Sequence, residues 1–410
     1  MGKLDVDGPI AGSAQASTAV LPDEDRFNLG AVVTVSVGHF AHDGYVSLIG
    51  PLLPLLIQKH GLSLAAAGGL ATVPRWPGVL QPFMGYLADR YGTRTFVVWG
   101  PTVTALAMCT LGLAPNYLTL VALLLISGFS SSCFHPAAGA MASHAGGRHW
   151  GRASSYFMTG SELSRTVGPP FIVAVVSLFS LEGAWVAALP ALAYSFLAQR
   201  GLRRQEAKVQ RQASVSALWA GVRARGRALL TLIGVVTFRS LVIASFQVFF
   251  ATYLVERGES LLYAGMAVAV YEGGGVVGSF AGGQVSDRFG RRSVMALSQL
   301  LAGPLLYGAL IWSGTSPGLV ALCLGGMLAL SAGPVQLTLA QELLPGNRSV
   351  ASGIIMFLSF EGSIFATLFI GFFADAVGLQ NALAWSVLAS MLSLPFTLLL
   401  PETRPAGRGD

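Results

Sequence analysis

Seven charged side chains interrupt the long apolar stretches of this sequence, and their chemistry is the first feature that needs an explanation. They are Asp43, Arg75, Glu162, Arg165, Arg239, Glu272 and Glu361. An ionised side chain at the centre of a bilayer costs about 2.5–3.5 kcal/mol on insertion scales, so each one needs a partner, water or a function. Four acids against three bases leave one carboxyl group without a fixed partner. Such a group could bind and release a proton.

The four acids are therefore the candidates for proton coupling: Asp43, Glu162, Glu272 and Glu361. Glu162 is the first choice, because Arg165 follows it by three residues and lies on the same face of a helix. Asp43 follows His39 by four residues, so these two side chains can also hydrogen-bond on one helix face. A structural salt bridge is the alternative role for each acid.

Substrate binding has its own candidates. Arg165 and Arg239 could hold an anionic group of a small molecule, with gating or packing ion pairs as the alternative. His135 precedes Pro136 and could contact a ligand or serve as a hydrogen-bond partner at a helix bend. Aromatic side chains of the same stretches could line an apolar pocket, with helix packing as the alternative. They are Tyr45, Phe246 and Tyr271.

Several other kinds of chemistry are not supported. Gly273, Gly275 and Gly278 match G-x-G-x-x-G, but they lie in an apolar helix with no strand before them, so we expect no dinucleotide site. There is no phosphate-binding loop, no HExxH, no paired CxxC and no Ser-His-Asp pattern. The six histidines are scattered, which is poor metal geometry. We expect no catalytic residue, metal or cofactor. A membrane enzyme using Glu162 and His135 is a disfavoured alternative.

The elements that must position these side chains are membrane-spanning helices. Hydrophobic residues make up 53% of the 410 residues and charged residues 11%, against about 25% charged in soluble domains. The mean hydropathy is +0.64. Runs of about 20 apolar residues fit helices that cross a bilayer. The twelve predicted spans are 28–57, 65–88, 95–114, 117–144, 152–178, 183–199, 227–255, 262–286, 293–313, 316–343, 349–374 and 380–400.

These spans divide the chain into two halves of six. The predicted organisation is a disordered tail (1–27), a first bundle (28–199), a basic linker (200–226), a second bundle (227–400) and a short tail (401–410). Of the 25 Lys and Arg residues, 20 lie in the tails and in the loops on the linker side, and two lie in the opposite loops. The positive-inside rule then places both termini in the cytoplasm. The basic residues on the cytoplasmic side of the membrane account for the net charge of +6, so this charge does not indicate binding to nucleic acid.

A repeated motif links the two halves. Gly85, Asp89 and Arg90 follow the second span, and Gly283, Asp287 and Arg288 follow the eighth, each within a Gly-xxx-Asp-Arg-aromatic-Gly string. The two strings are 198 residues apart, at the same point of each half, so the halves are predicted to be structural repeats. We expect both strings to act as conformational hinges. The same shift places Arg239 near the His39–Asp43 segment.

The two strings resemble the signature loop of the major facilitator superfamily. The resemblance implies an all-α membrane protein with two six-helix, pseudo-symmetric bundles around a central cavity, which works by alternating access. It also implies that spans three, six, nine and twelve face lipid, and these four contain no charge. Thr93 departs from the pattern, because the family usually has a basic residue there.

Within that superfamily, several segments are similar to the fosmidomycin-resistance group of bacterial drug exporters. They are Pro51–Pro54, Gln81–Pro82, Phe134–Ala138 and Ala340–Gly346. The similarity implies a monomeric, proton-coupled exporter of a small drug-like solute in lipid of the inner membrane. An uptake symporter of organic anions and an exporter of lipid-like molecules are the alternatives. The charged segment around Glu162 and Arg165 departs from such relatives, which usually have uncharged small residues there.

Overall fold

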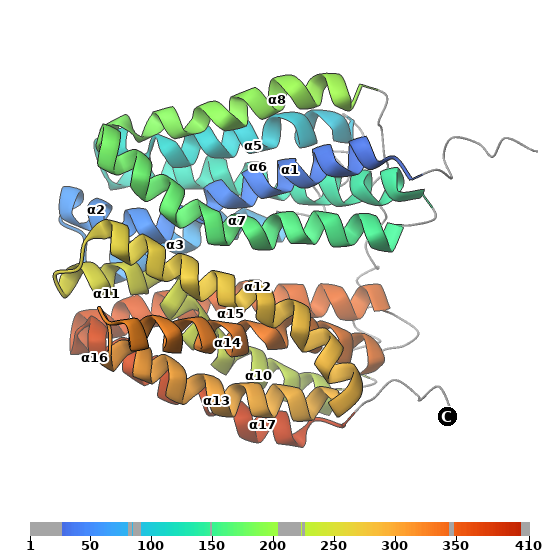
Figure 1. The fold of residues 1–410 in the computed structure, drawn as a ribbon, viewed down its shortest axis with the longest axis vertical. Coiled ribbons are helices and arrows are strands. Elements are labelled where there is room, and N and C mark those ends of the chain that lie inside the picture. Colours follow the sequence, from blue (N-terminus) through green and yellow to red (C-terminus); the bar gives the residue numbers. More distant parts are fainter. Residues whose placement is uncertain are drawn as a thin grey trace, which may run out of the picture.

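The computed structural model describes residues 27–80, 84, 92–147, 150–203, 223, 226–343 and 348–402. All regular structure in these ranges is helical. Figure 1 shows the helices as two stacked groups, with the blue-to-green first half of the chain above the yellow-to-red second half. The long helices of both groups run in roughly the same direction across the view. This arrangement confirms the predicted all-α fold of two helical bundles.

The first bundle contains the helices that carry most of the candidate residues. Its elements are α1 (Leu29–Val46), α2 (Ile49–His60), α3 (Leu64–Thr72), η2 (Val73–Leu80), α5 (Thr93–Cys109), η3 (Leu111–Leu113), α6 (Tyr117–Gly146), α7 (Trp150–Phe179), η5 (Glu182–Ala188) and α8 (Leu189–Gly201). The first span is split between α1 and α2 because Pro51 cannot donate a backbone N–H to the helical carbonyl four residues earlier. The split occurs at Ser47 and Leu48.

The second bundle repeats this plan. Its elements are α10 (Gly226–Ala244), η6 (Ser245–Phe249), α11 (Phe250–Glu256), α12 (Leu261–Phe289), α13 (Arg291–Ile311), α14 (Ser316–Leu343), α15 (Arg348–Val377), α16 (Leu379–Ser390) and α17 (Ser393–Leu399). The short η6 is a turn of π-helix inside the seventh span. Such π turns are rare and often occur at functional sites.

Ten helical stretches of the described chain are long and apolar enough to cross a membrane. The other two predicted spans correspond to α3 with η2 and to η5 with α8, each of which combines an α-helix with a 3-10 segment. The predicted spans therefore match the helices in order and number. Ser63, Asn116 and Ser260 each accept a hydrogen bond from the backbone N–H three residues on, which fixes where three of these helices begin.

The two bundles pack tightly at the end of the molecule opposite the linker, which we call the far end. There the start of α3 meets the last turns of α15. A Cβ atom on Gly371 would lie 2.6 Å from the carbonyl oxygen of Leu64, so only glycine allows this approach. Asp375 of α15 accepts hydrogen bonds from the backbone N–H groups of Leu64 (2.8 Å) and Ala65 (2.9 Å). A carboxylate of one bundle thus caps a helix of the other.

Candidate functional site

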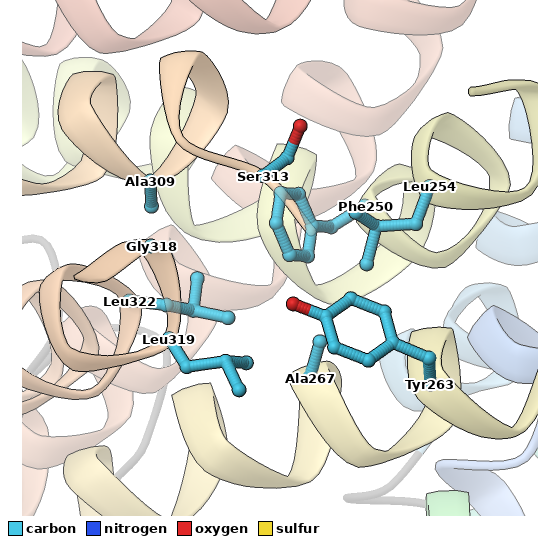
Figure 2. A pocket seen from close by; sticks show the side chains of 9 residues that line it. All are labelled: Phe250, Leu254, Tyr263, Ala267, Ala309, Ser313, Gly318, Leu319 and Leu322. Carbon is cyan, nitrogen blue, oxygen red and sulfur yellow. The ribbon is translucent and has the colours of Figure 1, made fainter. Parts of the chain in front are cut away.

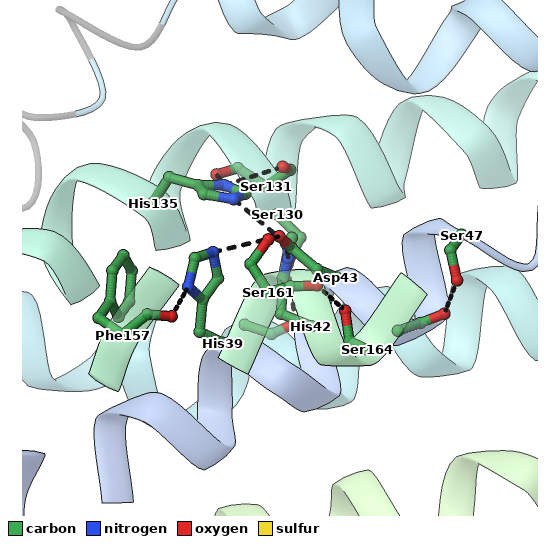
Figure 3. Close-up of polar contacts among 12 residues, drawn as sticks. His39, His42, Asp43, Ser47, Ser130, Ser131, His135, Phe157, Ser161 and Ser164 are labelled. Atoms are coloured by element: carbon green, nitrogen blue, oxygen red, sulfur yellow. Dashed lines mark hydrogen bonds and ion pairs between the residues drawn. The ribbon is translucent and has the colours of Figure 1, made fainter. Parts of the chain in front are cut away.

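A cluster of three imidazoles surrounds the carboxylate of Asp43 in the first bundle (Figure 3). Nε2 of His39 lies 3.1 Å from Oδ2, Nδ1 of His42 lies 2.9 Å from Oδ1, and Nε2 of His135 lies 3.2 Å from Oδ1. The hydroxyl of Ser161 donates a hydrogen bond to Oδ2. One carboxylate therefore has four polar neighbours, from α1, α6 and α7. We call this group the Asp43 cluster.

Backbone carbonyls and aromatic rings hold two of the imidazoles in place. Nδ1 of His39 lies 2.8 Å from the carbonyl oxygen of Phe157, whose ring stacks on the imidazole at a centroid distance of 3.8 Å. Nδ1 of His135 lies 3.0 Å from the carbonyl oxygen of Ser131, one turn earlier on α6. These contacts fix which ring nitrogen faces Asp43. His135 therefore hydrogen-bonds within its own helix, as considered for a residue at a helix bend, and also contacts the carboxylate of Asp43.

The expectation that the histidines are too scattered to form one site is wrong for this cluster. His39 and His135 are far apart in sequence, but ligand atoms of His39, Asp43 and His135 lie within 4.8 Å of one another. Helix packing produces this convergence, because α1 contacts both α6 and α7. The side chains of Asp43 and His135 are 17% and 32% exposed, whereas that of His39 is 4% exposed. The cluster is thus accessible from one side.

A second charged group connects the two bundles. Oε1 of Glu162 lies 2.5 Å from Nη2 of Arg165 on α7, as the spacing predicted. Nε of Arg165 lies 3.9 Å from Oε2 of Glu272 on α12 of the second bundle. The side chain of Gln247, in the π turn η6, hydrogen-bonds to Glu272 as well. Arg165 therefore lies between an acid of its own bundle and an acid of the other.

The charge of Arg239 suggested contact with an anionic group of a substrate, but its side chain has other partners. Its side chain is buried, and it donates to Oε1 of Gln299 (2.8 Å) and to the carbonyl oxygen of Ala329. Gln299 in turn donates to the carbonyl and hydroxyl oxygens of Ser390 at 2.9 Å. These acceptors lie on α13, α14 and α16, within the second bundle. The arrangement gives Arg239 a packing role and takes away the geometric support for substrate contact.

The candidate aromatic residues are buried in helix contacts. The hydroxyl of Tyr45 donates to the carbonyl oxygen of Ala187 at 2.7 Å. Phe246 stacks on Tyr271 at a centroid distance of 5.6 Å, and both are almost fully buried. The hydroxyl of Tyr271 is buried without a hydrogen-bond partner in the described part of the chain. Packing, the alternative considered for these residues, accounts for Tyr45 and Phe246. Only Tyr271 retains a free polar group.

The remaining two charged candidates have simple surroundings. Glu361 is half-buried on α15 and has no ion pair with a described residue. Arg75 donates to the carbonyl oxygen of Ala71 at 2.9 Å, one turn earlier. Neither residue joins the Asp43 cluster or the charged group around Arg165. Proton coupling by Glu361 stays a prediction without support from a contact.

Only the second hinge string can be compared with the prediction, because Gly85, Asp89 and Arg90 lie outside the described residues. Asp287 lies 2.5 Å from Nη1 of Arg291, one turn later. Nη2 of Arg291 lies 3.0 Å from Oε1 of Glu342, at the end of α14.

Three helices of the second half are therefore tied together by one guanidinium group. Gly283 lies near the end of α12, and its carbonyl oxygen accepts a hydrogen bond from Nη1 of Arg291 at 3.5 Å. Arg288 is exposed. Thr93 is the equivalent of Arg291 in the first half, and it has no charge.

A small pocket lies in the second bundle, away from both charged groups (Figure 2). It is lined by Phe250, Leu254, Tyr263, Ala267, Ala309, Ser313, Gly318, Leu319 and Leu322. Its cavity volume is about 10 Å³, roughly the space of one water molecule and far below the roughly 300–1,000 Å³ of sites that hold drug-sized ligands. The lining has no charged residue, and helix packing explains it.

Sequence reasoning assigned no separate role to four residues that complete these groups. His42, Ser161 and Gln247 contact the candidate acids, and Asp375 joins the bundles at the far end. The adjacency of His42 to Asp43 and of Ser161 to Glu162 could have suggested two of them. No local pattern marks Gln247 or Asp375, because their partners come from distant segments.

The sequence and the fold are both similar to those of known transporters. The family model described as "Major Facilitator Superfamily" matches residues 35–360 and 256–410. The fosmidomycin resistance protein of Escherichia coli (strain K12) is 26% identical over 406 residues, which cover 97% of each chain. The uncharacterized MFS-type transporter YfnC of Bacillus subtilis (strain 168) is 27% identical, over 90% of this chain and 92% of that protein.

A third relative matches a shorter part. The multi-drug resistance efflux pump PmrA homolog of Lactococcus lactis subsp. lactis (strain IL1403) is 31% identical over 164 residues, or 38% of this chain and 40% of that protein.

Among solved structures, an inward-facing, unoccupied bacterial homolog of the human lysosomal transporter Spinster gives a TM-score of 0.77. It is 14% identical and covers 90% of this chain and 96% of that one. A mutant of the nucleoside transporter NupG gives 0.70, at 14% identity, over 90% and 99% of the two chains.

Proposed function

This chain belongs to the Major Facilitator Superfamily, whose members are secondary transporters that work by alternating access, and on that premise we propose that it exports a small organic solute in exchange for protons. The direction is supported by the names of two relatives, a fosmidomycin resistance protein and a multi-drug efflux pump homolog. The observation that carries the coupling is the Glu162–Arg165–Glu272 group, because it joins the two bundles that must move relative to each other.

The chemistry of this group suits exchange. The Glu272 carboxylate can be neutralised by Arg165, by a proton or by a cationic group of a substrate, and the proton and the substrate compete for it. A proton on Glu272 removes its attraction for the substrate group and favours release of the substrate. Loss of that proton restores the attraction and allows the next substrate to bind. Proton binding and substrate binding therefore exclude each other at one side chain, which is the condition for exchange.

Alternating access also requires contacts that hold one end closed and can break. The packing of Gly371 on Leu64 and the Asp375 cap on α3 join the two bundles at the far end. We infer from these contacts that this end is the closed one. Opening the far end must separate them. We propose that the Asp375 cap is the polar latch of the far end.

We further propose that the linker end faces the cytoplasm, that the protein lies in the inner membrane and that it works as a monomer. The basic residues on the linker side support the orientation. Both described ends of the chain lie on that side in Figure 1. A reporter fused after Arg404 and a label placed in the 203–225 segment should both report the cytoplasm. Labelling of that segment from outside intact cells would contradict the orientation.

Proton coupling is tested in proteoliposomes loaded with a substrate found by ligand stabilisation of the purified protein. An imposed proton gradient should drive substrate accumulation by the wild type. Glu272→Gln should abolish this accumulation and retain counterflow exchange, which needs no net proton movement. Glu256→Gln is the matched control, because Glu256 is exposed at the end of α11 in the same bundle. Gradient-driven accumulation by Glu272→Gln and Glu162→Gln at wild-type level would contradict the proposal.

A further inference from the structure

The Asp43 cluster has a feature that export does not require. Nδ1 of His39 faces the carbonyl oxygen of Phe157, and Nδ1 of His135 faces the carbonyl oxygen (3.0 Å) and the hydroxyl (3.1 Å) of Ser131. The carbonyl oxygens can only accept hydrogen bonds, so they favour hydrogens on the Nδ1 atoms, and neutral imidazoles of this form present lone pairs at both Nε2 atoms. These lone pairs point at the carboxylate of Asp43, at 3.1 Å and 3.2 Å. Three electron-rich groups converge, and a cation between them would relieve their repulsion.

We propose that His39, Asp43 and His135 form a binding site for one divalent transition-metal ion, with Zn²⁺ as its representative. Ligands of tetrahedral zinc lie about 2.0–2.1 Å from the metal, which puts any two of them roughly 3.3 Å apart. Nε2 of His39 is 3.1 Å from Oδ2 of Asp43 and Nε2 of His135 is 3.2 Å from Oδ1, so each imidazole is already at this separation from one of the two carboxylate oxygens. The ligand atoms of all three residues lie within 4.8 Å of one another, so small side-chain rotations complete the site.

The surroundings also match those of a metal site. A histidine that binds a metal usually donates its other N–H to a carbonyl or carboxylate, which orients the ring. The carbonyl oxygens of Phe157 and Ser131 have this role for His39 and His135. The carboxylate is held as well, by Ser161 and by Nδ1 of His42. Each of the three ligands therefore has a partner outside the site.

The types of ligand atom and the exposure of the site determine which metal ions it can bind. Two imidazoles and one carboxylate suit Zn²⁺, Co²⁺, Ni²⁺ and Fe²⁺, whereas Mg²⁺ and Ca²⁺ prefer oxygen ligands alone. Three protein ligands leave at least one coordination position for water or an oxygen atom of a bound solute. The partial exposure of Asp43 and His135 provides the route by which a hydrated ion enters.

The test uses full-length protein without a polyhistidine tag, purified in detergent. Co²⁺ is the spectroscopic probe, because its visible absorption reports the coordination geometry, and Zn²⁺ is titrated by calorimetry. We expect one ion per chain and a Zn²⁺-dependent rise in the melting temperature. His135→Ala should weaken Zn²⁺ binding at least about 100-fold, and Ser161→Ala about 10-fold. His144→Ala is the matched control, because His144 is exposed on the same helix, α6.

Three results would overturn the proposal. One is a wild-type protein that gives neither a bound-Co²⁺ spectrum nor heat with Zn²⁺. The second is His135→Ala protein that binds Zn²⁺ as tightly as the wild type. The third is an equal loss in His144→Ala. His135→Gln, at a partly exposed position, replaces the alanine variant if that variant fails to fold. Its melting temperature without metal should stay near that of the wild type, and its response to Zn²⁺ should be lost.

Discussion

The first helix of each bundle carries a polar residue at nearly the same point of the 198-residue repeat, but the two polar groups are built in opposite ways. Around Asp43, three imidazoles converge on one carboxylate, and one side of the group is accessible. Around Arg239, an amide and a carbonyl oxygen receive the guanidinium in a closed, buried setting. The first group can change its charge by binding a cation. The second holds a fixed charge with its donors in use.

The two halves of the chain also differ in their polar contacts at the linker end. Arg291 connects Asp287 and Glu342 in the second half, whereas the first half has the uncharged Thr93 at the equivalent position. The pseudo-symmetry of this fold therefore applies to the helices and not to the chemistry. The imidazole–carboxylate cluster belongs to the first bundle alone, whereas the buried Arg239 contacts and the Arg291 contacts belong to the second.

The largest expected effect comes from removing the fixed charge. Arg239→Ala leaves the acceptors on Gln299 and Ala329 without a donor in a buried place. We expect a loss of about 3 kcal/mol in the free energy of unfolding, since unsatisfied buried groups cost about 1–3 kcal/mol each. Asp43→Asn should change it by much less, because this site is partly exposed. Thermal melts in detergent compare the two. Wild-type stability with lost substrate binding in Arg239→Ala would show a ligand role instead.

A smaller effect should follow from removing the latch between the bundles. Asp375→Asn keeps the size of the side chain but weakens the two hydrogen bonds to the start of α3. We expect the ratio of far-end-open to far-end-closed molecules to rise about fivefold, the equivalent of about 1 kcal/mol. Spin labels on α3 and α15 at the far end should then report longer distances. Glu259→Gln, in a far-end loop, is the control. An unchanged distance distribution would argue against the latch.

Arg291→Thr tests this difference between the two halves at the linker end, because it places at Arg291 the residue type that the first half has at the equivalent position, Thr93. The variant loses the contacts to Asp287 and Glu342. We expect a loss of about 1 kcal/mol in stability, because the acids are partly exposed, and a changed cysteine accessibility at the linker end. Asp287→Asn should act in the same direction and less strongly. Wild-type melting and wild-type accessibility in both variants would remove the hinge role of this string.

The smallest effect concerns Glu402, which accepts hydrogen bonds from the backbone N–H groups of Arg292 (3.0 Å) and Ser293 (3.1 Å). Partial burial raises its pKa, but hydrogen bonds from Ser293 and Arg292 outweigh this and lower it below the usual 4.5. A carboxylate with a lowered pKa stabilises the fold above 4.5, and this contribution is lost as the pH falls through the folded-state pKa. The melting temperatures of the wild type and Glu402→Gln should therefore converge in acid. A constant difference would contradict the cap.

The fold could be predicted from the sequence almost completely, and the site only in part. Apolar runs and the repeated hinge string determine the order of the helices, and the pair Glu162–Arg165 follows from helical periodicity. The approach of His135 to Asp43 depends on how α6 packs on α1, which no local pattern encodes. The prediction for Arg239 was made from its charge alone, and a count of charges ignores carbonyl and amide acceptors, which here satisfy the guanidinium without an acid.

The central claim is that a proton and the substrate compete for Glu272, at the contact that Arg165 makes across the two bundles. It is tested most directly by recording the pH inside proteoliposomes with a trapped dye while a substrate gradient is imposed. The account predicts proton movement opposite to the substrate for the wild type, and none for Glu272→Gln under conditions where its counterflow exchange continues. Proton movement of wild-type size in Glu272→Gln, with equal substrate flux, would contradict it.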